Sequence, residues 1–144
     1  MLTQSCDCQL PGPACGAWKL AARDTFIGWQ SAQRLKNLHR VVNNASFFIL
    51  PWMQCKGLAC KILSIVNRQL RHHWQQRYGF KPVLLETFVE CEHHRGRSYK
   101  AANWVHVGKA VGCGKKSRVQ QQIIPFKDIW LYPLKRNFRA ALCA

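Results

Sequence analysis

The sequence predicts an α/β fold, in which a mixed sheet carries a long helix after its central strand. Short apolar runs that suit strands alternate with segments of helical spacing along the 144 residues. The clearest helical pattern, at residues 58–79, stands between two strand-like segments at 46–51 and 81–90. We therefore expect these two strands to be parallel around the helix, and the two last strands to form an antiparallel end.

The N-terminal part is predicted to contain a leader, a strand and a helix. Residues 1–16 are polar, rich in Pro and Gly and without periodicity, so we expect a disordered leader. Residues 17–22 alternate enough for a short strand. Asp24 suits the N-cap of a helix that continues to Val42, and the Asn pair at 43–44 suits its end.

The middle of the chain contains the strongest patterns. The run "SFFILP" at 46–51 is continuously apolar and ends at Pro51, which is typical of a strand buried on both faces. Residues 58–79 form an amphipathic helix that ends at Gly79. The apolar stripe of this helix is predicted to contain Leu58, Ile62, Ile65, Val66, Leu70 and Trp74.

The C-terminal part is predicted to add three strands and a short helix. Residues 81–90 form the first of these strands, and 95–104 form a loop that leads into the short helix. The two last strands, 104–112 and 127–134, are separated by a Gly-rich basic turn.

Two ligand motifs are excluded by their spacing. The basic turn is not a nucleotide P-loop, because Lys109 stands where the pattern needs its first Gly and Lys116 where it needs Ser or Thr. The N-terminal cysteines, in "CDCQLPGPAC", match no standard zinc spacing, and "CEHH" at 91–94 has no second pair of ligands. No metal site is therefore expected.

The charge balance indicates the kind of partner. The chain has 22 Lys and Arg against 6 Asp and Glu, a net charge of +16, which favours nucleic acid or another polyanion. A basic protein that meets no nucleic acid remains the alternative. No apolar run is long enough for a membrane helix and no secretory signal is visible, so we expect a cytoplasmic protein with reduced thiols and no membrane partner.

The start of the long helix is a candidate anion site. A Gly-containing turn there feeds a helix N-terminus, where free N–H groups and the helix dipole favour a negative ligand. The pattern Q-x-x-G-x-A resembles the pyrophosphate loop of the GNAT acyltransferase fold, which implies acetyl-CoA or another acyl-CoA as cofactor. A helix start without a ligand is the other interpretation. The residues concerned are Gln54, Lys56, Gly57, Leu58 and Ala59.

The same resemblance implies catalytic residues. Tyr99 takes the position of the tyrosine that acts as general acid on the departing thiolate in that fold, and Asn103-Trp104 take the place of a Gly-Phe element. Glu86 and Glu90 are the best available bases, and period-2 alternation puts them on one face of their strand. Two plainer roles stay open: a core position for Tyr99, and salt bridges with Lys or Arg for the glutamates.

A closer resemblance runs over about residues 17–143. The motifs that carry it, in chain order, are "RDTFIGW", "NNASFFILPWMQ", "LACKILS", "YGFKPVLLETFVE", "SYKAANWVHVG" and "KDIWLYPL". Together they resemble the DruA family, which belongs to Druantia anti-phage defence systems and is also associated with transposases. The resemblance implies a prokaryotic protein that works beside other defence-system or transposase components.

The sequence also departs from that family. Members are longer at the N-terminus, so we expect residues 17–144 to be the C-terminal part of a DruA-like domain whose first strands are missing. Arg97-Ser98 replace a small residue and Thr, and "GKAVGCG" at 108–114 lacks a Thr and an Arg. A truncated or decaying gene copy, without function, would account for these departures.

Two functions follow from the sequence. The first is a GNAT-like enzyme that acts on or near nucleic acid. The second is a non-catalytic nucleic-acid-binding module. The plainer interpretation of the same basic residues is an ordinary solvated loop. The candidate nucleic-acid-binding residues lie around the basic turn and are Arg95, Arg97, Lys100, Trp104, Lys109, Lys115, Lys116 and Arg118.

Overall fold

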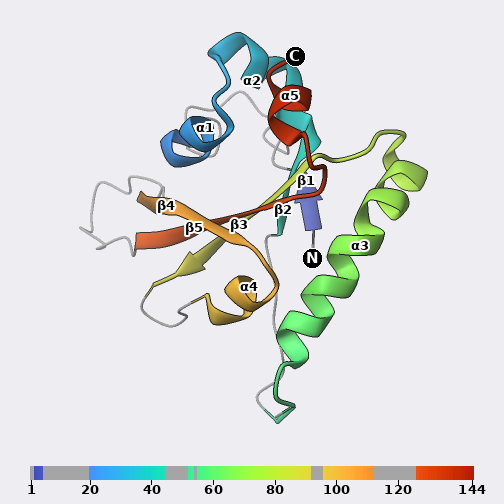
Figure 1. Cartoon of the computed structure of the whole chain (residues 1–144), viewed down its shortest axis with the longest axis vertical. Coiled ribbons are helices and arrows are strands. Elements are labelled where there is room, and N and C mark those ends of the chain that lie inside the picture. The colour runs from blue at the N-terminus through green and yellow to red at the C-terminus, as the bar shows by residue number, and fades with distance from the viewer. Residues whose placement is uncertain (1, 5–19, 45–51, 54, 92–95, 112–125) are drawn as a thin grey trace, which may run out of the picture.

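The computed structural model describes residues 2–4, 20–44, 52–53, 55–91, 96–111 and 126–144 (Figure 1). In these ranges, five strands form one sheet in the order β1-β2-β3-β5-β4. The strands are β1 (Leu2–Gln4), β2 (Val41–Asn44), β3 (Leu84–Glu90), β4 (Val105–Val111) and β5 (Phe126–Pro133).

The pairing of the strands confirms the predicted α/β class. β2 and β3 are parallel, with Val41 opposite Leu84, and the long helix connects them. β5 is antiparallel to both β3 and β4, so the other end of the sheet is antiparallel. The parallel partner of β3 is β2, whereas we had expected 46–51, which lies outside the described residues.

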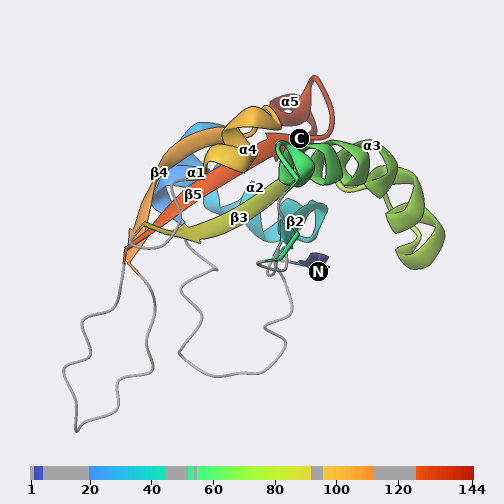
Figure 2. The same ribbon diagram turned by 90° about the horizontal axis from the view of Figure 1, so that it is seen from below.

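Helices cover both faces of this sheet (Figures 1 and 2). One face, here the α1 face, is covered by α1 (Ala21–Ile27), α2 (Ser31–Asn37) and α5 (Phe138–Leu142), with a 3-10 turn at Leu38–Arg40. The other, the α3 face, is covered by α3 (Leu58–Tyr78) and α4 (Arg97–Ala101).

Each face has its own hydrophobic core, because successive side chains of a strand point to opposite sides. On the α1 face the buried residues are Leu20, Ile27, Trp29, Leu38, Val41, Val83, Leu84, Ile129, Leu131, Phe138 and Leu142. On the α3 face they are Val42, Leu63, Leu70, Trp74, Leu85, Val89, Tyr99, Ala102, Trp104 and Trp130.

The predicted helix from Asp24 to Val42 is wrong. Two short helices replace it, because Gly28 ends α1 in the left-handed conformation, with φ 82°. Asp24 lies inside α1, whose N-cap is Leu20. Val41 and Val42 form β2, where both are fully buried beside β3, so strand pairing outweighs their helical spacing.

The two N-terminal predictions are also corrected in part. Ala21 and Ala22, expected to end a strand, begin α1, and residues 17–19 lie outside the described ranges. Residues 2–4, expected in a disordered leader, form β1 and pair with β2. The backbone carbonyls and amides of β2 thus have a neighbouring strand on each side.

α3 confirms the predicted helix and its end at Gly79, which is left-handed with φ 79°. Its buried stripe differs from the prediction: Leu63 and Asn67 are buried with Leu70 and Trp74, while Ile65 is 54% exposed. No helix in the described ranges is both long and apolar enough to cross a membrane.

Candidate functional site

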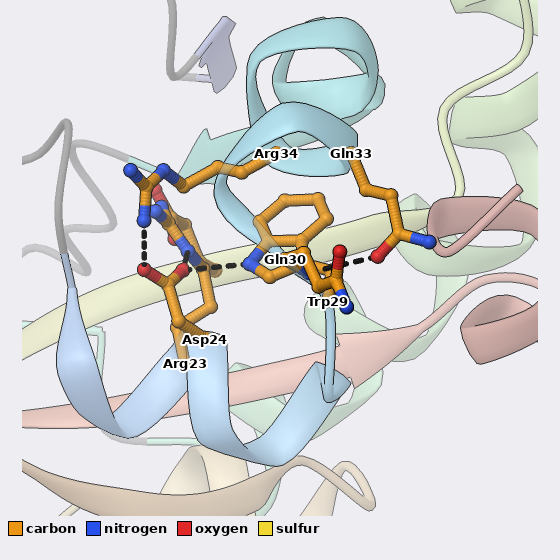
Figure 3. Close-up of polar contacts among 7 residues, drawn as sticks. Arg23, Asp24, Trp29, Gln30, Gln33 and Arg34 are labelled. Carbon is orange, nitrogen blue, oxygen red and sulfur yellow. Dashed lines mark hydrogen bonds and ion pairs between the residues drawn. The ribbon is translucent and has the colours of Figure 1, made fainter.

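A cluster of buried charges joins α1 and α2 to the sheet (Figure 3). Arg23 Nη1 lies 3.0 Å from Glu86 Oε2 of β3, and both side chains are almost fully buried. Arg34 Nη1 lies 2.8 Å from Asp24 Oδ2. Trp29 Nε1 donates a hydrogen bond of 2.9 Å to Asp24 Oδ1, so this carboxylate is held by α2 and by the segment that connects α1 to α2.

Local sequence places these side chains. α2 begins with a capping box in which the Gln30 N–H donates to Gln33 Oε1 at 2.8 Å, which fixes the first turn of the helix. Arg34 is then directed toward Asp24 of α1 (Figure 3). The cluster contains two cations and two carboxylates, so its formal charges balance.

Glu86 is a structural residue in this arrangement. Burial raises the pKa of Glu86 above its ordinary value, and the Arg23 charge beside it lowers the pKa only in part. The side chain of Glu86 is 1% exposed, and a substrate in solvent does not reach it. Its ion pair with Arg23 agrees with the salt bridge to Lys or Arg that the sequence analysis left open for Glu86.

Glu90 also forms an ion pair. Its Oε1 lies 3.6 Å from Lys127 Nζ, and both side chains are more than a third exposed. Glu86 and Glu90 lie on the same face of β3, as alternation requires. This is the α1 face, because Glu86 contacts Arg23 of α1 and Phe88 packs against the core of that face.

Tyr99 lies on the opposite side of the sheet. It is 9% exposed in the core of the α3 face, where Asn44 Nδ2 donates to its hydroxyl at 3.3 Å. Thr87 Oγ1 in turn donates to the carbonyl oxygen of Asn44 at 2.9 Å. Burial raises the pKa of Tyr99, although hydrogen bonds with Thr87 and Asn44 lower it in part.

The structure therefore separates the acid from the bases that the sequence suggested. Tyr99 and Thr87 are on the α3 face, whereas Glu86 and Glu90 are on the α1 face. A proton donor and a proton acceptor that serve one substrate must both reach it. With β3 between them, these residues do not form a common site.

The candidate cofactor loop is exposed at the start of α3. Gly57 is the N-cap, left-handed with φ 77°, and no side chain caps the helix. The Leu58 N–H already donates to the carbonyl oxygen of Cys55 at 3.1 Å, so the turn itself uses one amide of the site. Lys56 is exposed and Ala59 is half-buried. Gln54 lies outside the described residues.

The candidate nucleic-acid-binding residues are brought together only in part. Arg97 and Lys100 of α4 and Lys109 of β4 are exposed. Trp104 is 4% exposed, with its ring 5.1 Å from that of Tyr99 and 5.7 Å from that of Tyr132, measured between centroids. It is a core residue and offers no surface for base stacking. The remaining four, Arg95, Lys115, Lys116 and Arg118, lie outside the described residues.

The positions of the acidic residues leave the surface of α3 and α4 basic. Every Asp and Glu side chain in the described ranges lies beside a basic side chain. Asp24, Glu86 and Glu90 form the ion pairs given above, and Asp128 Oδ1 lies 3.0 Å from His106 Nε2. α3 and α4 contain no acidic residue. The exposed cations of these two helices are therefore not neutralised by a carboxylate of their own element.

Sequence reasoning missed the buried cluster around Asp24. The available signal was the scarcity of acids, since only 6 residues of 144 are Asp or Glu. In so basic a chain, a carboxylate within an apolar strand such as β3 needs a buried cation as its partner.

The described ranges bring together no group of three or more His, Cys, Asp or Glu that could hold a metal ion.

Comparisons with known proteins assign most of the chain to one family. The family model described as Druantia protein DruA matches residues 11–122. This match begins before residue 17, where the motif resemblance was expected to start. No match was found among curated proteins, and none among solved structures.

Proposed function

This chain belongs to the DruA family, and we propose that it serves an anti-phage Druantia system, or a related mobile element, as a nucleic-acid-binding component. Other components of that system or a transposase would be its partners. The observation that carries this proposal is a set of exposed cations on α4 and β4, namely Arg97, Lys100 and Lys109, here called the α4 surface.

The α4 surface is free to attract phosphates. Among the described residues, none of its three cations forms an ion pair, while every described carboxylate already lies beside a basic group. Lys and Arg side chains that contact phosphates release counterions from the nucleic acid, which supplies affinity without sequence information.

α4 is fixed to the sheet by two contacts beneath this surface. Tyr99 anchors α4 to the sheet through Asn44, and Gly96 packs directly on the ring of Trp130. Side chains on a helix fixed in this way lose little backbone entropy when they bind. Such a platform supports binding better than an isolated flexible loop would.

Neutralising the α4 surface is expected to flatten the salt dependence of DNA binding. Arg97→Ala and Lys100→Ala should each reduce the slope of log K against log salt by about 0.9, because each removes about one phosphate contact. Fluorescence anisotropy with a short duplex at several salt concentrations measures this slope.

The matched control for these variants is Lys36→Ala, since Lys36 is exposed on α2 over the opposite face. It should leave the slope unchanged. If the α4 variants behave like Lys36→Ala, or if the wild-type chain binds no nucleic acid, the proposal is wrong.

Acyl-CoA binding is the second candidate. The order β2, α3, β3, α4, β4, β5 is the one expected of a GNAT-like domain, and α3 begins without a side-chain cap or an acidic residue in its first turn. The amide of Leu58 is occupied by the turn, and Tyr99 lies far from the glutamates across the sheet, which favours nucleic-acid binding over acyl transfer.

Acetyl-CoA is expected to stabilise the chain if this loop holds a cofactor. At a free concentration of 100 times the dissociation constant, the gain is about 2.7 kcal/mol, which a thermal melt detects. Gly57→Trp should abolish the gain by blocking the loop. Gly79→Trp is the matched control, because Gly79 is also left-handed but lies at the other end of α3. If acetyl-CoA does not shift the melting temperature of the wild-type chain, acyl-CoA binding is ruled out as a function.

A further inference from the structure

The outward face of α3 is an exposed, mostly polar stripe that contains two cations and no acidic residue. At 100° per residue, the side opposite the buried Leu63, Asn67, Leu70 and Trp74 contains seven residues, all of them exposed. These residues, here called the α3 stripe, are Lys61, Ile65, Arg68, Gln69, His72, Gln75 and Gln76.

The chemistry of the α3 stripe matches base edges as well as phosphates. Arg68 has the donor geometry that pairs with guanine, and the amide of Gln69 has the donor and acceptor that pair with adenine. Ile65, 54% exposed, offers the apolar contact that a thymine methyl group accepts. No carboxylate on α3 opposes the approach of a polyanion.

The α3 stripe favours a duplex over a single strand. Proteins that bind single strands rely on exposed aromatic rings for base stacking. The α3 stripe contains no aromatic ring apart from the imidazole of His72, whose Nε2 lies 3.0 Å from Gln76 Nε2. The exposed Tyr78 at the end of the helix packs against Trp74, with ring centroids 4.5 Å apart.

The shape of the molecule leaves this helix accessible. Its 21 residues correspond to about 31 Å at 1.5 Å per residue. Figures 1 and 2 show α3 on the outside of the molecule, with its C-terminal part extending away from the sheet. The major groove of B-form DNA is about 12 Å wide and admits one α-helix.

We propose that α3 enters the major groove of duplex DNA and reads base sequence through the α3 stripe, while the α4 surface contacts phosphates of the same duplex. α3 and α4 cover the same face of the sheet, so one duplex can lie along both. This inference rests on the proposed nucleic-acid-binding function and adds sequence recognition to it.

Selection from a random duplex library tests the inference. The full-length chain is expected to enrich a short sequence motif. Arg68→Ala and Gln69→Ala should alter or remove that motif, because they delete base contacts. Arg97→Ala and Lys100→Ala should weaken binding of all sequences alike and preserve the motif, because phosphate contacts carry no sequence information.

The salt slope gives a second, independent readout. Arg68→Ala and Gln69→Ala should both weaken binding to the selected duplex with little change of slope, because they delete base contacts, whereas Arg97→Ala and Lys100→Ala should each reduce the slope by about 0.9. Circular dichroism and thermal melts check that these exposed substitutions leave the fold intact, and Lys36→Ala is again the control.

The outcomes separate this inference from the function on which it rests. If duplexes bind with a slope that depends on Arg97 and Lys100, but no motif is enriched or the motif survives both α3 substitutions, the α3 stripe does not read bases. If a selected single strand or an acidic protein segment binds the α3 stripe in place of duplex, the inference also fails. If no duplex binds but another nucleic acid does, this inference fails and the proposed function stands; if no nucleic acid binds at all, both are wrong.

Discussion

Arg23→Met is expected to lower the free energy of unfolding by about 3–5 kcal/mol, because it leaves the buried carboxylate of Glu86 without its cation. Arg23 has no exposed side-chain area, and Glu86 has 1%. Chemical denaturation of the wild-type and variant chains at pH 7 measures the difference. The double variant Arg23→Met/Glu86→Leu should regain most of the loss, since it removes the charge itself.

The pH dependence of this loss has a definite sign. Burial raises the pKa of Glu86 above its ordinary 4.5, so the folded chain holds this proton more tightly than the unfolded chain does. A raised carboxyl pKa gives stability that is present at low pH and is lost as the pH rises through the folded pKa. Removing Arg23 raises the pKa further. The destabilisation by Arg23→Met should therefore shrink as the pH falls toward 4.5.

The exposed pair provides the matched control for the buried one. Lys127→Met removes the cation beside Glu90, but both side chains are more than a third exposed, so water solvates the remaining carboxylate. The expected loss is below about 1 kcal/mol. Equal losses for Lys127→Met and Arg23→Met would contradict the view that burial makes the Arg23–Glu86 pair important.

Gly96→Ala is expected to cost about 2–5 kcal/mol, from two causes that act together. Gly96 is left-handed with φ 63°, where a side chain costs about 1–2 kcal/mol. A Cβ atom there would also lie 2.5 Å from Cζ2 of the buried Trp130, so the ring must move out of a packed core. Such overpacking adds about 1–3 kcal/mol.

Gly79→Ala separates these two causes. Gly79 is left-handed with φ 79°, but a Cβ atom there meets nothing within 4 Å. Its loss should therefore be about 1–2 kcal/mol, from backbone strain alone. Urea denaturation of both variants gives the comparison. If they lose the same stability, the contact between Gly96 and Trp130 does not constrain α4 in solution.

The buried ion pair and the left-handed glycine both hold helices against the sheet. The Arg23–Glu86 pair fixes α1 on one face of β3, and Gly96 fixes the start of α4 on the other. Because Arg97 and Lys100 lie in the helix that begins after Gly96, a shift of α4 would also displace the α4 surface. Nucleic-acid binding by Gly96→Ala should therefore weaken together with its stability.

The elements predicted correctly from sequence are those whose pattern is complete within one segment. The helix ending at Gly79, the short helix after 95 and the two last strands agree with the structure, and the strand predicted over 81–90 is present from Leu84 to Glu90. Periodicity and helix stops depend on neighbours in the chain, so the amino-acid sequence alone determines them.

Other features depend on residues that are distant in the chain. Val41 and Val42 become a strand because β3, some forty residues later, pairs with them. Glu86 becomes the partner of a buried ion pair because Arg23, 63 residues earlier in the chain, lies against it. In both cases the local pattern left more than one role open, and a non-local contact decided between the alternatives.

The candidate site shows the same division. From sequence alone one obtains the net charge of +16 and the choice of Arg97, Lys100 and Lys109 as candidate nucleic-acid-binding residues. Only the tertiary structure decides that Trp104 is buried and that Tyr99 and Glu86 lie on opposite faces of β3. The reason is that composition and spacing specify which groups are present, whereas packing against the sheet specifies which of them can meet.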